Sequence, residues 1–315
     1  MKKIVVLNAD KINYDHKLDL SGFGENTVIY GDTPEELIIE RIQGASILVT
    51  KELPLSRTLI EQIPDSIELI CEAGTGYNNI DLEAAEKKQI HVCNVPAYSS
   101  ERVAHTVIMM ICNASSSMKK QMRMLLEGDH RNFTDHLMVD HVEINGKTLG
   151  IIGAGNIGKE VMKTALAMGM NILVYTRTPQ KDSEHIRYVD LNSLLKLSDY
   201  VSLHCPLNET TYHMINQKTL ALMKPTAFLI NTSRGALIDE EALLEALLNH
   251  QIAGAGLDVQ EIEPPREDHP FYKMDEVILT PHMGWRGLET RQRLIDKLLD
   301  NIHQYERGNP INMVL

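Results

Sequence analysis

Three short segments of the sequence carry ionisable side chains directly after apolar runs that are typical of strands. The segments are residues 231–235, 257–265 and 280–285, and they contain Arg234, Glu263 and His282. A planar guanidinium suits a carboxylate, and an imidazole exchanges protons near neutral pH. Each residue alone could equally be structural, as a salt bridge, a solvated turn or a capped loop histidine. Each of the three residues follows the end of an expected strand, which is where open α/β sheets bind ligands. Together they indicate a catalytic site.

A glycine-rich turn precedes these segments in the chain. Gly153-Ala154-Gly155-Asn156-Ile157-Gly158 follows the strand-like run 149–152 and opens an expected helix over 157–168. The glycines permit a tight turn, and the helix N-terminus offers N–H groups to a pyrophosphate. The alternative is an ordinary glycine-rich turn with nothing bound. The strand before the motif and the helix after it favour dinucleotide binding.

The end of the next expected strand bears on which dinucleotide is bound. In NAD-binding chains an acidic residue stands there, about 20 residues on, and binds the ribose hydroxyls. Here the sequence reads Val174-Tyr175-Thr176-Arg177-Thr178, without a carboxylate. Thr176 and Arg177 suit a 2′-phosphate, so NADP(H) is favoured as the cofactor. In the alternative, Arg177 is a solvated loop residue and NAD(H) is used.

Strand-like and helix-like segments alternate along the chain, which is typical of parallel sheets covered by helices. The expected strands are 4–7, 47–50, 69–71, 91–94, 149–152, 171–175, 200–203, 227–230, 256–258 and 277–280. The expected helices are 34–43, 57–62, 81–88, 157–168, 239–250 and 288–306. A longer helix is expected over 99–127, and its apolar first half predicts burial between elements or subunits. The pattern predicts two α/β units without a linker.

Length and composition bound the class of protein. A chain of 315 residues predicts two domains, and its net charge of -12 argues against nucleic acid or an anionic membrane as partner. No run approaches the roughly 20 apolar residues of a membrane helix, and residues 3–7 suit a strand better than a signal peptide. The four cysteines are far apart, which predicts reduced thiols and a cytoplasmic location. The scattered histidines predict no metal site.

Motifs over essentially the whole chain resemble the D-isomer-specific 2-hydroxyacid dehydrogenase family, closest to its glycerate dehydrogenase/hydroxypyruvate reductase branch. They read AGTGYNNIDLEAA, NVPAYSSERVA, GKTLGIIGAGNIG, HCPLNETT, INTSRGALID, GLDVQEIEPP, LTPHMGW, RQRL and GNPIN. Individually these motifs are modest, but in this order and spacing they are highly specific. The resemblance implies an NAD(P)H-dependent enzyme that reduces a small 2-keto acid, of the hydroxypyruvate or glyoxylate type, to the D-2-hydroxy acid.

The resemblance also implies a role for each member of the trio. Arg234 would bind the substrate carboxylate and polarise the carbonyl, a task that suits a guanidinium. His282 would donate a proton to the nascent alkoxide in reduction and accept it in oxidation. Glu263 would orient His282 and favour its protonated form. The cofactor would carry the hydride, so the protein would supply positioning and electrostatics.

Further residues would hold the two ligands by the same resemblance. The cofactor site would comprise Gly153, Gly155, Asn156, Ile157, Gly158, Thr176, Arg177, Cys205, Pro206, Thr210, Thr232 and Asp258, with Asp258 near the nicotinamide. Cys205 is a poor nucleophile because no base partner is indicated. The substrate would be bound by Thr75, Gly76, Tyr77, Arg234 and His282. The turn at 75–77 would present backbone N–H groups to the carboxylate, and a plain turn is the alternative.

The resemblance implies a discontinuous domain plan. Residues 1–98 and 288–315 would form a flavodoxin-like substrate domain, and residues 99–287 a Rossmann NAD(P)-binding domain. The active site would be the inter-domain cleft, whose closure would exclude water before hydride transfer. The apolar helix that starts near Ser99 would be the contact of a homodimer.

Rival interpretations come from within the family and from outside it. D-lactate, formate and phosphoglycerate dehydrogenases share the fold, although phosphoglycerate enzymes often carry an extra regulatory domain that is not seen before Leu315. A non-catalytic dinucleotide-sensing corepressor would share both the fold and the trio. The acidic charge and the absence of appended recognition segments argue against that sensor. Turnover of glyoxylate or hydroxypyruvate with NADPH would separate the two classes.

Overall fold

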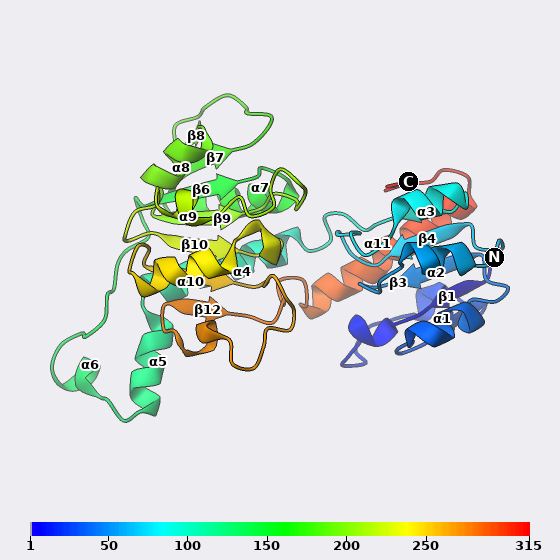
Figure 1. The fold of residues 1–315 in the computed structure, drawn as a ribbon, viewed down its shortest axis with the longest axis horizontal. Coiled ribbons are helices and arrows are strands. Elements are labelled where there is room, and N and C mark those ends of the chain that lie inside the picture. The colour runs from blue at the N-terminus through cyan, green and yellow to red at the C-terminus, as the bar shows by residue number, and fades with distance from the viewer. Residues whose placement is uncertain (1) are drawn as a thin grey trace. The chain divides into compact units, whose positions relative to one another are not determined.

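The computed structural model describes residues 2–315. The chain forms two compact units: Met1–Ser99 with Trp285–Leu315 make unit 1, and Ser100–Gly284 make unit 2. The chain therefore leaves unit 1 once, completes unit 2 and returns to unit 1 through its last helix (Figure 1). The borders stand at 99/100 and 284/285, where the sequence suggested 98/99 and 287/288.

Unit 1 is built on a five-stranded parallel sheet in the order β2-β1-β3-β4-β5. Its strands are β1 (Ile4–Val6), β2 (Thr27–Ile29), β3 (Ile47–Thr50), β4 (Leu69–Glu72) and β5 (His91–Cys93). Its α-helices are α1 (Glu35–Arg41), α2 (Arg57–Gln62), α3 (Leu82–Lys87) and α11 (Leu288–Glu306). This strand order is the flavodoxin-like one.

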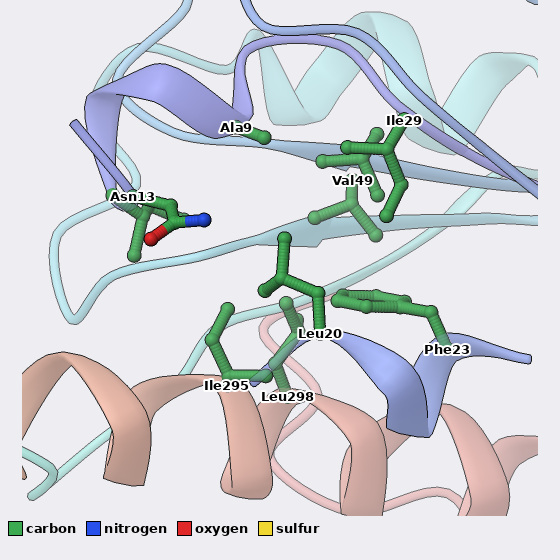
Figure 2. Close-up of a pocket in the computed structure, with 10 residues that line it drawn as sticks. Ala9, Asn13, Leu20, Phe23, Ile29, Val49, Ile295 and Leu298 are labelled. Atoms are coloured by element: carbon green, nitrogen blue, oxygen red, sulfur yellow. The ribbon is translucent and has the colours of Figure 1, made fainter. Parts of the chain in front are cut away.

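Different helices cover the two faces of this sheet, because successive strand residues point to opposite sides. Ile4 and Val6 pack with α11, whereas Val5 and Leu7 pack with α1, α2 and α3. A small cavity of about 10 Å³ remains on the α11 side and is lined mainly by apolar side chains, including Leu298 (Figure 2). A space of this size holds about one water, so it is a packing gap in the core and not a ligand site.

Unit 2 is built on a seven-stranded parallel sheet in the order β12-β11-β10-β9-β6-β7-β8. Its strands are β6 (Thr148–Ile152), β7 (Asn171–Tyr175), β8 (Ile186–Tyr188), β9 (Tyr200–Leu203), β10 (Phe228–Asn231), β11 (Gly254–Leu257) and β12 (Val277–Leu279). Its α-helices are α4 (Ser100–Ser115), α5 (Met118–Leu126), α6 (Arg131–Thr134), α7 (Asn156–Ala167), α8 (Leu191–Leu197), α9 (Gln217–Leu220) and α10 (Glu240–Leu248). The winding reverses between β6 and β9, which is the position where open α/β sheets bind ligands.

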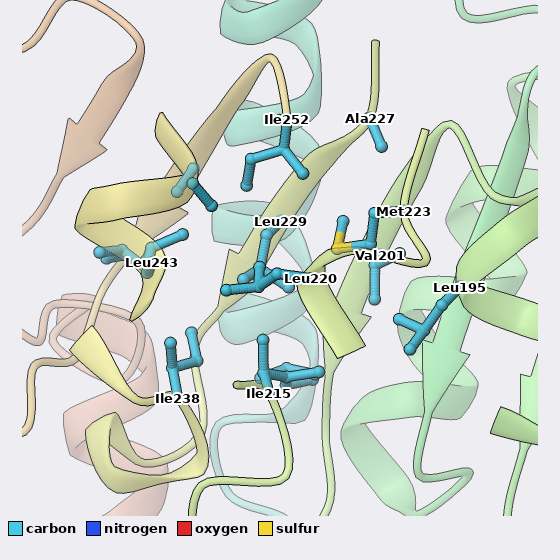
Figure 3. Packing of buried hydrophobic residues seen from close by; sticks show 14 of the residues in the cluster. Leu195, Val201, Ile215, Leu220, Met223, Ala227, Leu229, Ile238, Leu243 and Ile252 are labelled. Atoms are coloured by element: carbon cyan, nitrogen blue, oxygen red, sulfur yellow. The ribbon is translucent and has the colours of Figure 1, made fainter. Parts of the chain in front are cut away.

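Both faces of the second sheet are also covered. Helices α4 and α7 pack on one face, and α8, α9 and α10 pack on the other. In the second cluster, Leu229 of β10 packs with Leu220 of α9 and Leu243 of α10 (Figure 3). Val107 and Met110 of α4 are fully buried against unit 2 itself. The predicted α/β class with two parallel sheets is therefore confirmed.

The structure differs from the sequence-based expectation at several elements. The expected helix over 99–127 is two helices, α4 and α5, because Ser117 takes a left-handed φ of 47° at the end of a serine run that favours helix weakly. The edge strands β2 and β8 and the short helices α6, α8 and α9 were not expected. In β2, for example, Val28 and Ile29 are exposed, so the apolar pattern that marks a buried strand is missing.

Candidate active site

Loops after the parallel strands of unit 2 leave from one edge of its sheet. Ser233 Oγ, after β10, donates to the Cys205 carbonyl oxygen, after β9, at 2.8 Å. A Cβ on Gly235 would lie 1.9 Å from the carbonyl carbon of Gln260, so only glycine lets the loops after β10 and β11 approach this closely. The loops that carry the predicted catalytic residues therefore pack against one another.

His282 and Glu263 form a direct pair. His282 Nδ1 lies 2.8 Å from Glu263 Oε2. Because a carboxylate only accepts hydrogen bonds, Nδ1 carries the proton and Nε2 remains to exchange a proton with a ligand. The other oxygen of Glu263, Oε1, accepts the Gln260 N–H at 3.0 Å. The side chains of His282 and Glu263 are 26% and 35% exposed, so the imidazole is reachable from solvent.

Asp258 holds the loop that carries His282. Asp258 follows β11 and is 1% exposed. Its Oδ1 accepts Thr280 Oγ1 at 2.6 Å and the Met283 N–H at 2.8 Å, and its Oδ2 accepts the Gly284 N–H at 2.8 Å. The Asp258 carbonyl oxygen also accepts the His282 N–H at 2.9 Å. These bonds hold the loop in which His282 takes a left-handed φ of 49°, and the contact of Asp258 with the cofactor stays a prediction.

Arg234 stands on a turn that Asn231 fixes. Asn231 Oδ1 accepts the Ser233 N–H at 3.0 Å, and its Nδ2 donates to the Arg234 carbonyl oxygen at 2.8 Å. Arg234 Nη1 donates to the Ser233 carbonyl oxygen at 2.8 Å. Within residues 2–315 no carboxylate pairs with Arg234, which keeps most of its donors available for an anion.

The glycine-rich turn after β6 fits a bound pyrophosphate. Gly153 has a φ of 101°, and a Cβ there would lie 2.7 Å from the His204 carbonyl carbon. A Cβ on Gly158 would lie 2.2 Å from the Gly153 carbonyl oxygen, whereas one on Gly155 would meet no described atom within 4 Å. No side chain of the described chain caps α7, which begins at Asn156. The open space at Gly155 and the uncapped N–H groups are what a dinucleotide site needs.

Thr176 and Arg177 lie beside this turn, and Thr232 follows β10. The Gly153 N–H donates to the Tyr175 carbonyl oxygen at 2.9 Å, so the end of β7 adjoins the glycines. Thr176 and Arg177 follow directly, and Arg177 is exposed. Thr232 Oγ1, after β10, is buried without a hydrogen-bond partner among the described residues. A buried hydroxyl of this kind is suited to a polar ligand.

The loop after β9 contains Cys205, Pro206 and Thr210. Burial raises the pKa of Cys205 to about 11, so its thiol is protonated at neutral pH and is a weak nucleophile. Burial lowers the pKa of His204 to about 3, and this neutral ring lies with Nε2 2.8 Å from Ser202 Oγ. Its Nδ1 has no partner in the described chain. Thr210 is exposed and bonds to Asn208.

Comparison with known proteins decides the family. Residues 108–284 match the family described as D-isomer specific 2-hydroxyacid dehydrogenase, NAD binding domain. The chain is 36% identical over 322 residues to a hydroxypyruvate reductase of Blautia hydrogenotrophica, with 99% of each chain covered. The protein belongs to the D-isomer specific 2-hydroxyacid dehydrogenases. The predicted family is thereby confirmed.

Two further relatives are similar to this dehydrogenase. A glyoxylate reductase of Korarchaeum cryptofilum is 38% identical over 285 residues, which cover 89% of this chain and 86% of that protein. A solved acyclic imino acid reductase, in complex with NADPH and D-Arg, superposes with a TM-score of 0.84 at 30% identity over 99% of this chain and all of that one. The dehydrogenase is therefore an oxidoreductase that acts on a CH–OH group with a nicotinamide dinucleotide.

The predicted substrate turn of the dehydrogenase follows β4 in unit 1. Thr75 Oγ1 donates to the Val95 carbonyl oxygen at 3.1 Å, so the turn is tied to the end of β5. The backbone N–H groups of Thr75, Gly76 and Tyr77 have no acceptor within residues 2–315. Successive free N–H groups of this kind can bind an anion.

Sequence reasoning missed the supporting residues of the dehydrogenase site. Asn231 and Gln260 lie inside the motifs INTSRGALID and GLDVQEIEPP, but nothing in a polar residue type distinguishes a loop anchor from a ligand. No group of His, Cys, Asp and Glu in residues 2–315 is arranged to hold a metal ion. No helix of the described chain combines the length and the apolar character that a membrane span requires.

Proposed function

We propose that this dehydrogenase reduces a small 2-keto acid, of the hydroxypyruvate or glyoxylate type, to the D-2-hydroxy acid. The observation that carries the proposal is the His282–Glu263 pair, which leaves Nε2 of an accessible imidazole for proton exchange. The names of the two reductases from Blautia and Korarchaeum support the substrate class. When bound, the reduced nicotinamide supplies the hydride.

His282 completes the reduction with a proton. The carbonyl carbon gains the hydride, the carbonyl oxygen takes the electron pair of the C=O π bond, and protonated His282 gives that oxygen the proton from Nε2. The Glu263 carboxylate, 2.8 Å from Nδ1, stabilises the imidazolium that must form before each turnover. In the reverse direction the neutral ring accepts the proton.

Two groups are proposed to bind the substrate carboxylate. Arg234 lacks a carboxylate partner in the described chain and offers a planar pair of donors. The free N–H groups of Thr75, Gly76 and Tyr77 have the same complementarity to an anion.

We propose NADP(H) as the preferred cofactor. Residues 174–178 contain no carboxylate to bind ribose hydroxyls or to repel a 2′-phosphate. Exposed Arg177 has no ion-pair partner among the described residues, and the similar imino acid reductase is in complex with NADPH. NAD(H) is the competing cofactor.

We also propose a homodimer, with a second candidate contact surface besides helix α4, which the sequence suggested. Helix α4 buries Val107 and Met110 within unit 2, whereas its Ile108 and Met109 are only partly buried. Helices α5 and α6 instead extend away from the sheet of unit 2 (Figure 1). Met122, Leu126 and Phe133 are 58%, 86% and 78% exposed there, which favours burial against a second copy. The molar mass of the protein in solution tests whether two copies associate.

The proposed reaction is tested by steady-state kinetics with a panel of 2-keto acids and both NADH and NADPH. The wild type should turn over hydroxypyruvate or glyoxylate, and His282→Ala should lower turnover by roughly 10²–10⁴-fold. Cofactor binding should survive in the variant, because the turn at 153–158 is untouched. His185→Ala changes an exposed histidine outside the site and is the control. No turnover by the wild type, or wild-type turnover in His282→Ala, would contradict the proposal.

A further inference from the structure

Lys51 is a buried cation at the end of β3 in unit 1. Its residue is 4% exposed, which is rare for a lysine unless its charge is compensated. Asn8, which lies just after β1, fixes its backbone: Nδ2 donates to the Lys51 carbonyl oxygen at 2.6 Å, and Oδ1 accepts the Lys51 N–H at 2.9 Å. These two hydrogen bonds fix the backbone from which the Lys51 side chain extends.

The Lys51 ammonium lies between an indole ring and the glycine that starts the 74–77 turn. Nζ is 4.5 Å from the centroid of the Trp285 ring, within the range of a cation–π contact. A Cβ on Gly74 would lie 3.2 Å from Nζ and 3.4 Å from Glu72 Oε1. Nζ also pairs with Glu52 Oε1. The ammonium is therefore packed against the base of the turn.

Glu72 places a carboxyl group beside the same glycine. Its side chain is fully buried, Oε1 accepts the Glu52 N–H at 2.9 Å, and Oε2 accepts Asn79 Nδ2 at 3.0 Å and Thr50 Oγ1 at 3.2 Å. Burial raises the pKa of Glu72, and the charge of Lys51 opposes that rise. A buried carboxylate without a nearby cation is costly and would repel any second anion close by.

The same turn carries the free N–H groups of Thr75, Gly76 and Tyr77. Two of its carbonyl groups are occupied: the Val95 N–H donates to the Gly74 carbonyl oxygen at 2.9 Å, and Asn94 Nδ2 donates to that of Thr75 at 2.7 Å. Glu72 stands two residues before this turn in the chain. An anion bound by the free N–H groups would therefore approach the Glu72 carboxyl group. The net charge beneath the turn therefore decides how well an anion binds.

We propose that Lys51 is a positioning residue for the substrate turn: it offsets Glu72, packs between Gly74 and Trp285, and thereby sets the affinity for the substrate carboxylate. The inference rests on the proposed function, in which the N–H groups of residues 75–77 receive a 2-keto acid. Lys51 itself touches neither substrate nor cofactor in this proposal. Its removal should therefore act on substrate affinity and leave the hydride and proton steps in place.

Kinetics of four variants test the inference. Lys51→Met removes the charge at similar length, and the keto-acid KM should rise by roughly ten-fold or more while kcat and the cofactor KM stay nearly constant. Lys51→Arg should retain most of the affinity. Lys51→Met with Glu72→Gln removes both charges and should recover much of the KM, which also guards against a single variant that fails to fold. Lys88→Met is the matched control, because Lys88 is a partly buried lysine of unit 1 bonded to the Ile63 carbonyl oxygen.

Tryptophan fluorescence provides a readout that does not depend on turnover. Trp285 is the single tryptophan of the chain, so the tryptophan emission comes from the ring that Lys51 contacts. The emission should change in Lys51→Met and change little in Lys51→Arg or Lys88→Met. The Arg286 guanidinium, 5.8 Å from the same ring, is present in every variant and does not affect the comparison.

The possible results separate the two proposals. An active wild type whose Lys51→Met variant keeps the wild-type keto-acid KM would overturn the inference and leave the proposed function intact. An equal loss of keto-acid affinity, cofactor affinity and kcat would show that Lys51 is merely structural, and this also overturns the inference. A wild type without activity on any 2-keto acid would refute the proposed function, whatever the emission of Trp285 shows.

Discussion

Glu263→Gln keeps the size of the side chain but halves its capacity to accept hydrogen bonds. In the wild type, Oε1 accepts the Gln260 N–H at 3.0 Å and Oε2 lies 2.8 Å from His282 Nδ1. An amide has one acceptor oxygen and one donor nitrogen, so glutamine can serve one of these two donors and must oppose the other. In either orientation the charge that stabilises imidazolium is lost.

The geometry sets the size of the expected effect. A hydrogen bond to a charged group contributes about 1.5–3 kcal/mol, and the 35% exposure of Glu263 favours the lower end because water screens the charge. Since about 1.4 kcal/mol is a factor of ten in rate, kcat for keto-acid reduction should fall by roughly 10–100-fold. The keto-acid KM should change less, because Glu263 acts on the proton donor His282 and does not bind the substrate carboxylate.

The assay compares kcat and KM for one keto acid at saturating cofactor in the wild type, Glu263→Gln and Glu261→Gln. Glu261 stands on the same loop but pairs with His213, 3.0 Å away, so its variant controls for the charge of the loop. A kcat that is unchanged in Glu263→Gln would refute the reasoning, as would an equal loss in both variants.

Three further predictions follow from the same structure. Arg234→Lys keeps the charge but loses the planar pair of donors, so the keto-acid KM should rise by about ten-fold or more, and an unchanged KM would make Arg234 structural. Thr176→Asp with Arg177→Ala should reverse a preference for NADPH by on the order of 1–3 kcal/mol in the ratio of kcat/KM values, and a clear NADH preference in the wild type would contradict this reading. Hydrogen bonds from Arg291, at 2.8 and 2.7 Å, hold the pKa of Asp15 at about 2, below its ordinary 3.8. The stabilisation that these hydrogen bonds give is therefore complete above the ordinary pKa of 3.8 and is lost as the pH falls toward 2. The melting temperatures of the wild type and Asp15→Asn should converge as the pH falls through this range, and a constant difference would contradict the prediction.

The elements that the sequence predicted well are those with strong local signals. Strand Ile47–Thr50 and helices Arg57–Gln62 and Leu288–Glu306 have the expected bounds. The first is continuously buried, and Ser56 caps the second by accepting the Leu59 N–H at 3.3 Å. Strand β2 escaped prediction because it is an exposed edge strand of three residues, stabilised by pairing with β1, which a local pattern does not encode.

The order and spacing of the motifs predicted the family and the candidate residues, but not the contacts that support them. Asp258 bonds to residues 22 to 26 positions later in the chain, so its role in holding the loop of His282 depends on the meeting of two strand ends. The contact between Lys51 and Trp285 joins residues still farther apart. Long-range packing of this kind leaves no periodic signal in a single sequence.

The discontinuity of unit 1 has a consequence for biosynthesis. Ile4 and Val6 of the first strand pack with Leu294 and Leu298 of the last helix. A ribosome adds about 5–20 residues per second, so all of residues 100–284 must be made before α11 exists, a delay of roughly ten seconds or more. During that interval one apolar face of the first sheet has no helix to cover it, and such a face attracts chaperones or other nascent chains. The part of the protein that is synthesised first is thus the part that can be completed only last.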